Sequence, residues 1–232
     1  MLLFYIRHGD PIYTPDSLTE FGHQQAEALK HRLKLANLKE IYSSSSTRAV
    51  MTATPTAEML GLPITKLDWC HEGLAWKDFA IEMPDGKRKW TWAVPDMVSL
   101  FNSPEVRAMD RAWYDHPAFA DTNFKAGYQR IQREADAFME SLGYRHRPEL
   151  NGYEPIAPHG RSVALFAHEG FGRLFLSALL DIPYPMYSTR FSISHTSMTV
   201  IYFSDKAEIV QPVVLQHSGD SHLFAAGLPT QY

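Results

Sequence analysis

The apolar positions along the chain form short continuous runs and longer segments with helical spacing. The runs are typical of buried β-strands and lie at residues 2–6, 40–43, 64–67, 162–167, 198–203 and 209–215. The helical spacing predicts α-helices at residues 19–35, 47–60, 124–142 and 171–180. This alternation predicts an α/β fold with three layers, α/β/α, around a mostly parallel central sheet.

Local signals refine the ends of these elements. Thr19 is a good N-cap for the first helix, and Gly61 with Pro63 is a typical stop signal after the second. Pro55 is expected to kink or interrupt that second helix, because proline lacks an N–H and clashes with the preceding turn. The stretch 147–158, rich in proline and glycine, is expected to be a loop.

The periodicity becomes irregular between about residues 74 and 127, where tryptophans and prolines are interspersed. We interpret residues 1–232 as a single α/β domain with a helical and irregular cap inserted at about 74–127. The aromatic residues of the insertion either close a hydrophobic layer over the sheet or help to select a substrate. In the second case the candidates are Lys87, Arg88, Lys89, Trp90 and Trp92.

Composition narrows the class of protein. Hydrophobic residues make up 45% and charged residues 21% of the chain, which is typical of globular proteins. The net charge of -4 disfavours a nucleic-acid partner. Cys70 is the single cysteine, so no intrachain disulfide points to an oxidising compartment. The six residues before Arg7 are too short for a signal peptide, so we expect a soluble cytoplasmic protein without a membrane partner.

Chemically capable side chains follow several of the predicted strands. Arg7 and His8 follow the first strand, Arg48 starts the second helix, and His168 follows the strand at 162–167. The carboxyl ends of strands gather at one edge of an α/β sheet, so these residues can converge. Guanidinium groups bind phosphoryl oxygens, while imidazole can attack phosphorus. The sequence therefore predicts a site for a phosphorylated molecule.

The order of these motifs resembles that of the histidine phosphatase superfamily, in the branch that includes phosphoglycerate mutase. The resemblance extends over nearly the whole chain and rests on five segments, Arg7-His8-Gly9, Leu18-Thr19 through Gln25-Ala26, Ser43-Ser44 through Thr52-Ala53, Phe166-Ala167-His168 and His222-Leu223. It implies an enzyme whose His8 attacks the substrate phosphorus, while Arg7, Arg48 and His168 hold the transferred group. Water would then hydrolyse the phosphohistidine.

The resemblance also suggests the remaining roles. Glu72 falls where this branch has its general acid, and Glu169 falls where other branches have theirs, so both stay candidates with Glu72 preferred. Ser44 is a candidate phosphate contact. We expect the two arginines to lower the pKa of His8, and its second ring nitrogen to donate to a backbone carbonyl. His195 and His222, which resemble residues near the pocket floor, are left out of the catalytic set.

Two departures from the family pattern affect the function. Asp10-Pro11 follows the Arg-His-Gly motif, and proline removes an N–H donor from the phosphate loop. Gly73 and the residues after it do not reproduce the acid segment of phosphoglycerate mutases, so hydrolysis of a small phosphomonoester is favoured over mutase-type phosphotransfer. A non-catalytic phosphoester-binding module is a further alternative. The histidines show no metal-ligand spacing, so neither a metal nor a cofactor is expected, and the oligomeric state is left open.

Overall fold

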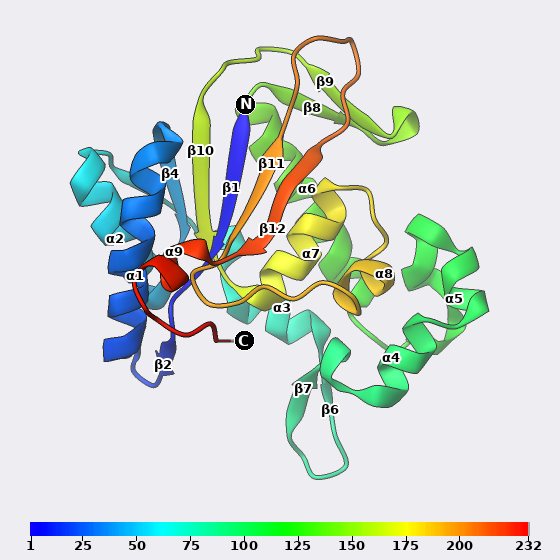
Figure 1. Cartoon of the computed structure of the whole chain (residues 1–232). Helices are drawn as coiled ribbons and strands as arrows, with labels where there is room; N and C mark the ends of the chain where they lie inside the picture. The colour runs from blue at the N-terminus through cyan, green and yellow to red at the C-terminus, as the bar shows by residue number, and fades with distance from the viewer. Residues whose placement is uncertain (232) are drawn as a thin grey trace.

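The computed structural model describes residues 1–231 and contains a six-stranded central sheet (Figure 1). In spatial order its strands are β12 (Val213–Gly219), β11 (Met198–Tyr202), β1 (Leu2–Arg7), β10 (Ser162–Ala167), β4 (Leu38–Ser44) and β5 (Ile64–Leu67). β1, β10, β4 and β5 pair in parallel, whereas β11 is antiparallel to both β1 and β12. The expected α/β fold with a mostly parallel sheet is confirmed.

Successive side chains of β1 point to opposite faces of the sheet and so belong to two separate hydrophobic cores. Leu3 and Tyr5 belong to a large core on one face of the sheet, whereas Phe4 and Ile6 belong to a smaller core on the other. The register of β1 against β10 pairs Arg7 with Ala167, so the two strands end at the same level. The residues that follow them, His8 and His168, therefore emerge side by side.

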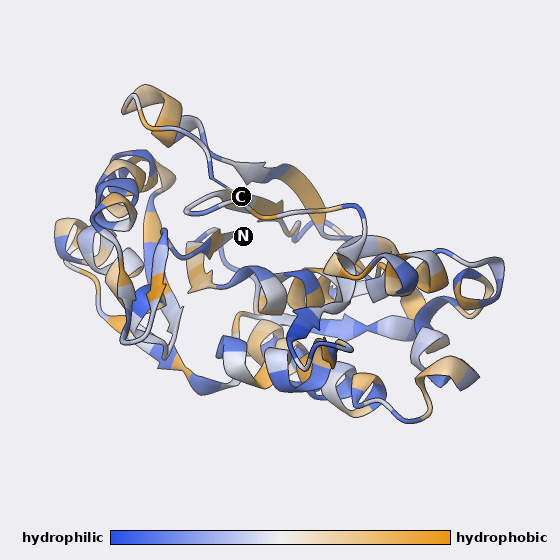
Figure 2. Cartoon of the chain, turned by 90° about the horizontal axis from the view of Figure 1, so that it is seen from below, coloured by the Kyte–Doolittle hydropathy of each residue, from blue (hydrophilic) through white to orange (hydrophobic). Residues whose placement is uncertain are grey.

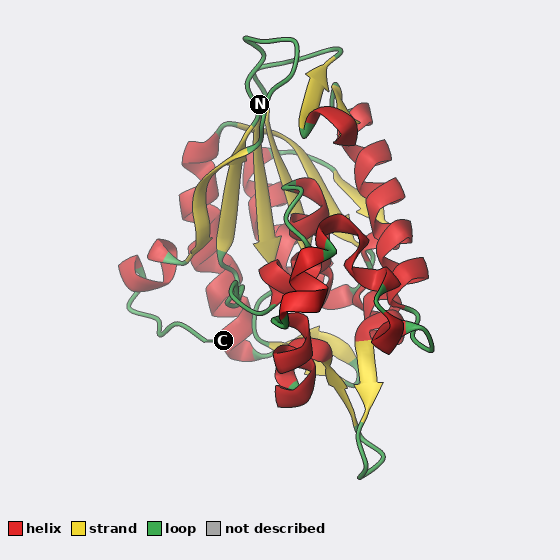
Figure 3. Cartoon of the chain, turned by 90° about the vertical axis from the view of Figure 1, so that its right-hand side faces the viewer, coloured by secondary structure: helices red, strands yellow, loops and turns green. Residues whose placement is uncertain are grey.

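Helices cover both faces of the sheet (Figure 3). The smaller core lies under α1 (Glu20–Leu33) and α2 (Thr47–Leu60), and the larger core lies under α6 (Phe124–Ser141) and α7 (Glu169–Leu179). The helices carry both hydrophilic and hydrophobic turns along their length, as Figure 2 shows, because one side packs inward and the other meets solvent. A short helix, α9 (Ser221–Ala225), lies against α1 near the C-terminus.

The predicted cap at Thr19 and the predicted interruption at Pro55 had different outcomes. Thr19 is the N-cap of α1, and its Oγ1 accepts a hydrogen bond of 3.0 Å from the Gly22 N–H. The predicted interruption at Pro55 is wrong, because α2 is continuous through it from Thr47 to Leu60. Ala53 and Ala57 are buried on either side of Pro55, so packing against the sheet holds the helix together across the missing hydrogen bond.

Several short strands depart from the sequence-based prediction. The expected loop at 147–158 overlaps a hairpin of β8 (Tyr144–Arg147) and β9 (Gly152–Pro155), which is anchored by the buried rings of Tyr144 and Tyr153. The last strand starts at Val213 rather than at 209, because Val210 pairs instead with Tyr153 in an isolated bridge. A further hairpin joins β2 (Pro11–Tyr13) and β3 (Asp16–Leu18).

The segment 74–127 is mostly helical and surrounds an aromatic layer. Its elements are α3 (Glu72–Phe79), β6 (Ala80–Glu82), β7 (Arg88–Trp90), α4 (Pro95–Phe101), α5 (Pro104–Ala108) and short 3-10 turns. Trp113 is fully buried and packs on Phe101 and Phe119. The hairpin of β6 and β7 extends beyond the end at which β1 finishes (Figure 1).

A buried histidine joins the β8–β9 hairpin to the helical layer. His146 lies 2.8 Å from Asp136 through Nδ1 and 3.2 Å from Asp181 through Nε2. Burial acts to lower its pKa, but hydrogen bonds to both aspartates and their charges outweigh burial and raise the pKa to about 9. The protonated imidazole can donate to both carboxylates at once.

This pKa predicts that the protein loses stability in mildly alkaline solution. The folded state binds the His146 proton more tightly than the unfolded state, so its contribution is complete below the ordinary histidine pKa and is lost as pH rises through about 9. We expect ~1–2 kcal/mol of unfolding free energy to disappear over this window, allowing for solvent screening. Urea denaturation of wild type and His146→Gln between these pH values measures the loss. Equal pH slopes for the two proteins would contradict the assignment.

Candidate active site

A cavity of about 690 Å³ lies at the carboxyl ends of the parallel strands. Arg7 and His8 enter it from the end of β1, and Arg48 enters from the first turn of α2. Glu72 and Glu169 reach it from the first residues of α3 and α7. The structure thus brings together residues that are far apart in the sequence. Beside these five residues, the lining comprises Tyr13, His71, Gly73, Trp76, Trp90 and Trp92.

His8 is held in one tautomer by its own backbone. Its Nδ1 lies 2.7 Å from the carbonyl oxygen of Gly9, which can only accept, so Nδ1 carries the proton. Nε2 is therefore the nitrogen with a free lone pair. Burial, followed by the charges of Arg7 and Arg48, lowers the pKa of His8 well below its ordinary value. The ring is neutral near pH 7, as a nucleophile requires.

His168 lies behind His8, with ring centroids 5.2 Å apart. A guanidinium N–H of Arg48 donates to its Nδ1 over 3.2 Å, so the proton of His168 resides on Nε2. Nε2 donates in turn to the hydroxyl of Ser44 over 2.8 Å. The side chain is fully buried, and burial, followed by the charges of His8 and Arg48, lowers its pKa well below the ordinary value.

Ser44 contacts His168 and is not among the residues that line the cavity. It is fully buried at the end of β4, and its oxygen also accepts from the Ser46 N–H at 3.3 Å. Both contacts engage the Ser44 hydroxyl within the protein, which disfavours direct binding of a phosphoryl oxygen by this side chain. The geometry instead fits a residue that fixes the orientation and the tautomer of His168.

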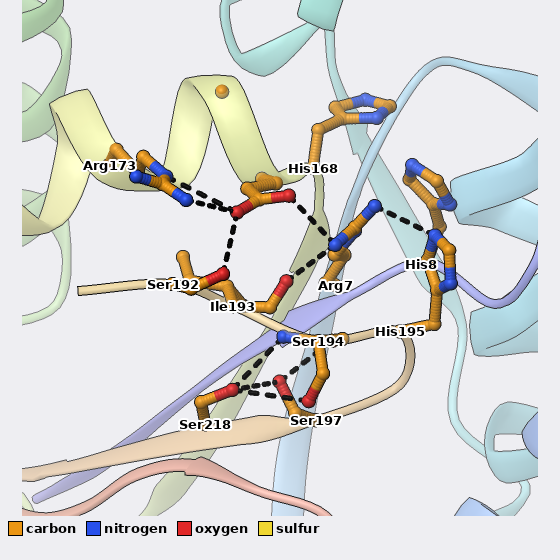
Figure 4. Close-up of polar contacts among 12 residues, drawn as sticks. Arg7, His8, His168, Arg173, Ser192, Ile193, Ser194, His195, Ser197 and Ser218 are labelled. Carbon is orange, nitrogen blue, oxygen red and sulfur yellow. Dashed lines mark hydrogen bonds and ion pairs between the residues drawn. The ribbon is translucent and has the colours of Figure 1, made fainter. Parts of the chain in front are cut away.

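Each arginine is fixed by several acceptors. Arg7 donates to Glu169 over 2.8 Å, to the Ile193 carbonyl over 2.6 Å and to His195 Nε2 over 2.7 Å, and the last two contacts can be followed in Figure 4. Arg48 donates to Asp16 over 2.6 Å, in addition to His168. These contacts leave N–H groups of both guanidinium ions free, so a phosphoryl group can bind between them.

The two candidate acids have opposite surroundings. The Glu72 carboxylate accepts the Gly170 N–H at 3.0 Å and the Phe171 N–H at 2.8 Å, at the start of α7. Burial raises the pKa of Glu72 despite these bonds. Burial also acts to raise the pKa of Glu169, but the charges of Arg7 and Arg173 outweigh it and lower that pKa. Glu72 is thus the carboxyl group that takes up a proton more readily.

The loop after His8 offers few backbone donors. The Gly9 N–H donates to Thr52 Oγ1 over 3.0 Å, and the Asp10 N–H donates to Gln25 Oε1 over 2.8 Å. Pro11 has no N–H at all. The loss of backbone donors that Asp10-Pro11 predicts is therefore present, and binding of an anion depends on the arginine side chains.

Several site residues were missed from the sequence. His71 lines the cavity and caps α3, where its Nδ1 accepts from the Gly73 N–H at 3.1 Å. Its position directly before Glu72 was the available signal. Tyr13 lies over Arg48 with its ring centroid 5.4 Å from the guanidinium carbon, and no periodic pattern marked it. His195, left out of the catalytic set, supports Arg7, while His222 bonds to Thr196 outside the cavity lining.

Within residues 1–231, no group of three or more histidine, cysteine, aspartate or glutamate side chains is placed to hold a metal ion. None of the helices in this described range combines the length and apolar character needed to cross a bilayer.

Known proteins resemble the chain in both sequence and fold. Residues 3–93 match the model of the histidine phosphatase superfamily (branch 1), whereas no curated protein gives a significant match. A phosphoserine phosphatase from Entamoeba histolytica, solved with phosphoserine, is 19% identical with a TM-score of 0.59, over 96% of this chain and 98% of its own. A mycobacterial glucosyl-3-phosphoglycerate phosphatase, solved with inorganic phosphate, is 18% identical with a TM-score of 0.57, over 95% and 98%.

A structure described as mycobacterial hydrolase 2 is 21% identical with a TM-score of 0.58, over 97% of this chain and 96% of its own. Identities this low show a shared fold. The segment that matches the family model contains Arg7, His8, Arg48 and Glu72. The sequence match to the histidine phosphatase superfamily thus covers residues 3–93, and nearly the whole chain shares its fold with the three solved structures.

Proposed function

We propose that the protein hydrolyses a small phosphomonoester through a phosphohistidine intermediate on His8. One observation supports this most strongly. His8 is a neutral imidazole with the lone pair of Nε2 free, and it lines the same cavity as Arg7 and Arg48. A neutral nucleophile beside two fixed cations suits attack on a phosphoryl group.

The residues divide the reaction between them. His8 Nε2 forms a bond to phosphorus while the ester P–O bond breaks, and Arg7 and Arg48 offset the charge on the phosphoryl oxygens. Glu72 gives its proton to the leaving alcohol oxygen, and the resulting carboxylate accepts a proton from the water that hydrolyses the phosphohistidine. Inorganic phosphate and the alcohol are the products.

His168 contributes in two ways in this proposal. Its Nδ1 accepts from Arg48, which fixes the guanidinium, and its ring packs against His8. Nδ1 carries no proton and cannot donate to a phosphoryl oxygen, so in this proposal His168 acts on the transferred group through Arg48. Residues 74–127 act as a cap that encloses the alcohol part of the substrate.

Rapid-quench incubation with ³²P-labelled ethyl phosphate tests this function. We expect release of labelled phosphate and a transient protein adduct that is labile in acid and stable in base. Supplying labelled 3-phosphoglycerate tests the mutase alternative, which requires migration of the phosphoryl group to a second hydroxyl. Binding of phosphate without turnover of any ester would favour the non-catalytic module instead.

Ser44→Ala is expected to lower kcat roughly 10-fold with little change in KM. The substitution removes the acceptor for the Nε2 proton of His168 and frees that ring to change tautomer. Ser43→Ala is the matched control, since Ser43 is equally buried but donates to the Ser44 carbonyl and does not touch His168. Steady-state kinetics of both variants, with rescue by Ser44→Thr, separate positioning from general destabilisation. A rise in KM alone would support direct phosphate contact by Ser44.

A further inference from the structure

Three tryptophans form a continuous wall on one side of the cavity. Trp76 and Trp90 meet edge to face with centroids 4.8 Å apart, and Trp90 stacks on Trp92 with centroids 4.6 Å apart. All three line the cavity and are half-buried. Half-buried tryptophans that face a cavity leave apolar surface available for a ligand.

This wall lies next to the proposed acid. The ring of Trp90 packs so closely on Gly170 that a Cβ added there would lie 2.4 Å from it, and the same Cβ would lie 2.8 Å from Glu72 Oε1. The leaving oxygen must approach Glu72 to receive its proton. The organic group attached to that oxygen therefore extends along Trp90 and its neighbours.

The arginines that contact the wall are already engaged with other groups of the protein. Arg173 lies 4.4 Å from the centroid of Trp92, and its N–H groups donate to Glu169 and to the Ser188 carbonyl. Arg88 lies 5.8 Å from the centroid of Trp76 and donates to the Lys77 carbonyl over 3.1 Å. Neither arginine lines the cavity, so neither offers a free charge to the substrate.

The charges that do line the cavity disfavour an acidic leaving group. Arg7 and Arg48 are the lining arginines of the described chain, and the phosphoryl group needs both. The lining contains no lysine, while the ionised Glu169 would repel a substrate carboxylate. A second anionic group would thus enter without a partner, which is costly in a partly buried site.

We infer that the preferred substrate is a phosphomonoester of an uncharged alcohol with a flat apolar ring, which stacks on the wall of Trp76, Trp90 and Trp92. This inference rests on the proposed phosphatase function and specifies its substrate class. It separates the protein from enzymes that act on phosphorylated carboxylic acids. The cations already stacked on Trp76 and Trp92 also make the wall a poor site for a cationic alcohol.

Four esters of primary alcohols test the inference with similar leaving groups: benzyl phosphate, ethyl phosphate, O-phosphoserine and 2-phosphoglycolate. We expect kcat/KM for benzyl phosphate to exceed that for ethyl phosphate by roughly 10-fold, a typical gain from stacking one ring. The two carboxylate-bearing esters should fall below ethyl phosphate. A preference for either of them would overturn the inference.

Variants of the wall provide the second test. Trp90→Ala and Trp76→Ala should each lower the benzyl-to-ethyl ratio of kcat/KM severalfold, and Trp90→Phe should retain most of it. Phe224→Ala is the control, since Phe224 is 89% exposed on α9 and does not line the cavity. Ratios that stay at the wild-type value in both tryptophan variants would show that the ring binds elsewhere.

A binding measurement separates the two proposals. If wild type released phosphate from none of the esters, the proposed hydrolysis would fail. Isothermal titration of wild type with benzyl and ethyl phosphate would still test the wall, because tighter binding of benzyl phosphate that is lost in Trp90→Ala supports it. Equal affinity for the two esters would overturn it.

Discussion

Replacing His8 with alanine is expected to reduce kcat by roughly 10⁴–10⁶-fold and to eliminate the phosphoprotein adduct. The imidazole supplies the electron pair that forms the bond to phosphorus. The second histidine cannot substitute, because Nε2 of His168 donates its proton to Ser44 and the Nδ1 lone pair accepts from Arg48. The measurement is quenched-flow labelling combined with release of phosphate at saturating substrate.

The fold should survive this substitution. The backbone N–H of His8 donates to the Ala167 carbonyl over 2.9 Å, and its carbonyl accepts from Thr196 over 3.3 Å, so alanine keeps both bonds. His23→Ala is a matched control, since His23 is an exposed histidine on α1 outside the cavity. An adduct of wild-type amount in His8→Ala would show that another residue is the nucleophile.

The parts of the site that could be predicted are those set by local pattern. The strand at 162–167 was predicted to the residue, and the run before Arg7 differs from β1 by one position. Because parallel strands place their carboxyl ends together, the convergence of Arg7, Arg48 and the histidines could be predicted from their places at strand ends or at a helix start.

The parts that could not be predicted depend on tertiary packing. Ser44 ends a strand, and sequence alone does not show whether its hydroxyl meets the cavity or the ring of His168. Nor does spacing separate Trp113, which is fully buried, from Trp90, which lines the cavity. Lys87 and Lys89, once candidates for substrate selection, lie outside the lining because the β6–β7 hairpin directs its turn into solvent. These outcomes depend on residues distant in the chain.

Glu72→Gln is expected to lower kcat by roughly 10²–10³-fold on benzyl phosphate, and by less than about 10-fold on 4-nitrophenyl phosphate. An alkoxide is a poor leaving group and needs a proton as the P–O bond breaks, whereas nitrophenolate does not. The raised pKa of Glu72 also predicts an alkaline limb in kcat as its proton is lost, and this limb should be absent in Glu72→Gln.

Comparison of the two esters is necessary because glutamine also disturbs the local structure. The carboxylate accepts both the Gly170 and Phe171 N–H groups, and an amide oxygen with an NH₂ group can satisfy only one of them in the same place. Loss of one of these hydrogen bonds should lower the turnover of both esters to a similar extent. Loss of the proton donor should lower mainly the turnover of the alkyl ester, benzyl phosphate.

Glu169→Gln provides the matched comparison. Its carboxylate is ion-paired with Arg7 and Arg173, so neutralising it should loosen Arg7 and raise KM for both esters to a similar extent. Kinetics of the two variants on the two esters therefore distinguish the two roles. Glu72→Gln should lose activity mainly on benzyl phosphate, whereas Glu169→Gln should be affected to a similar extent on both esters. If the selective loss on benzyl phosphate occurred in Glu169→Gln instead, Glu169 would be the acid, and Glu72 would serve only to hold the start of α7.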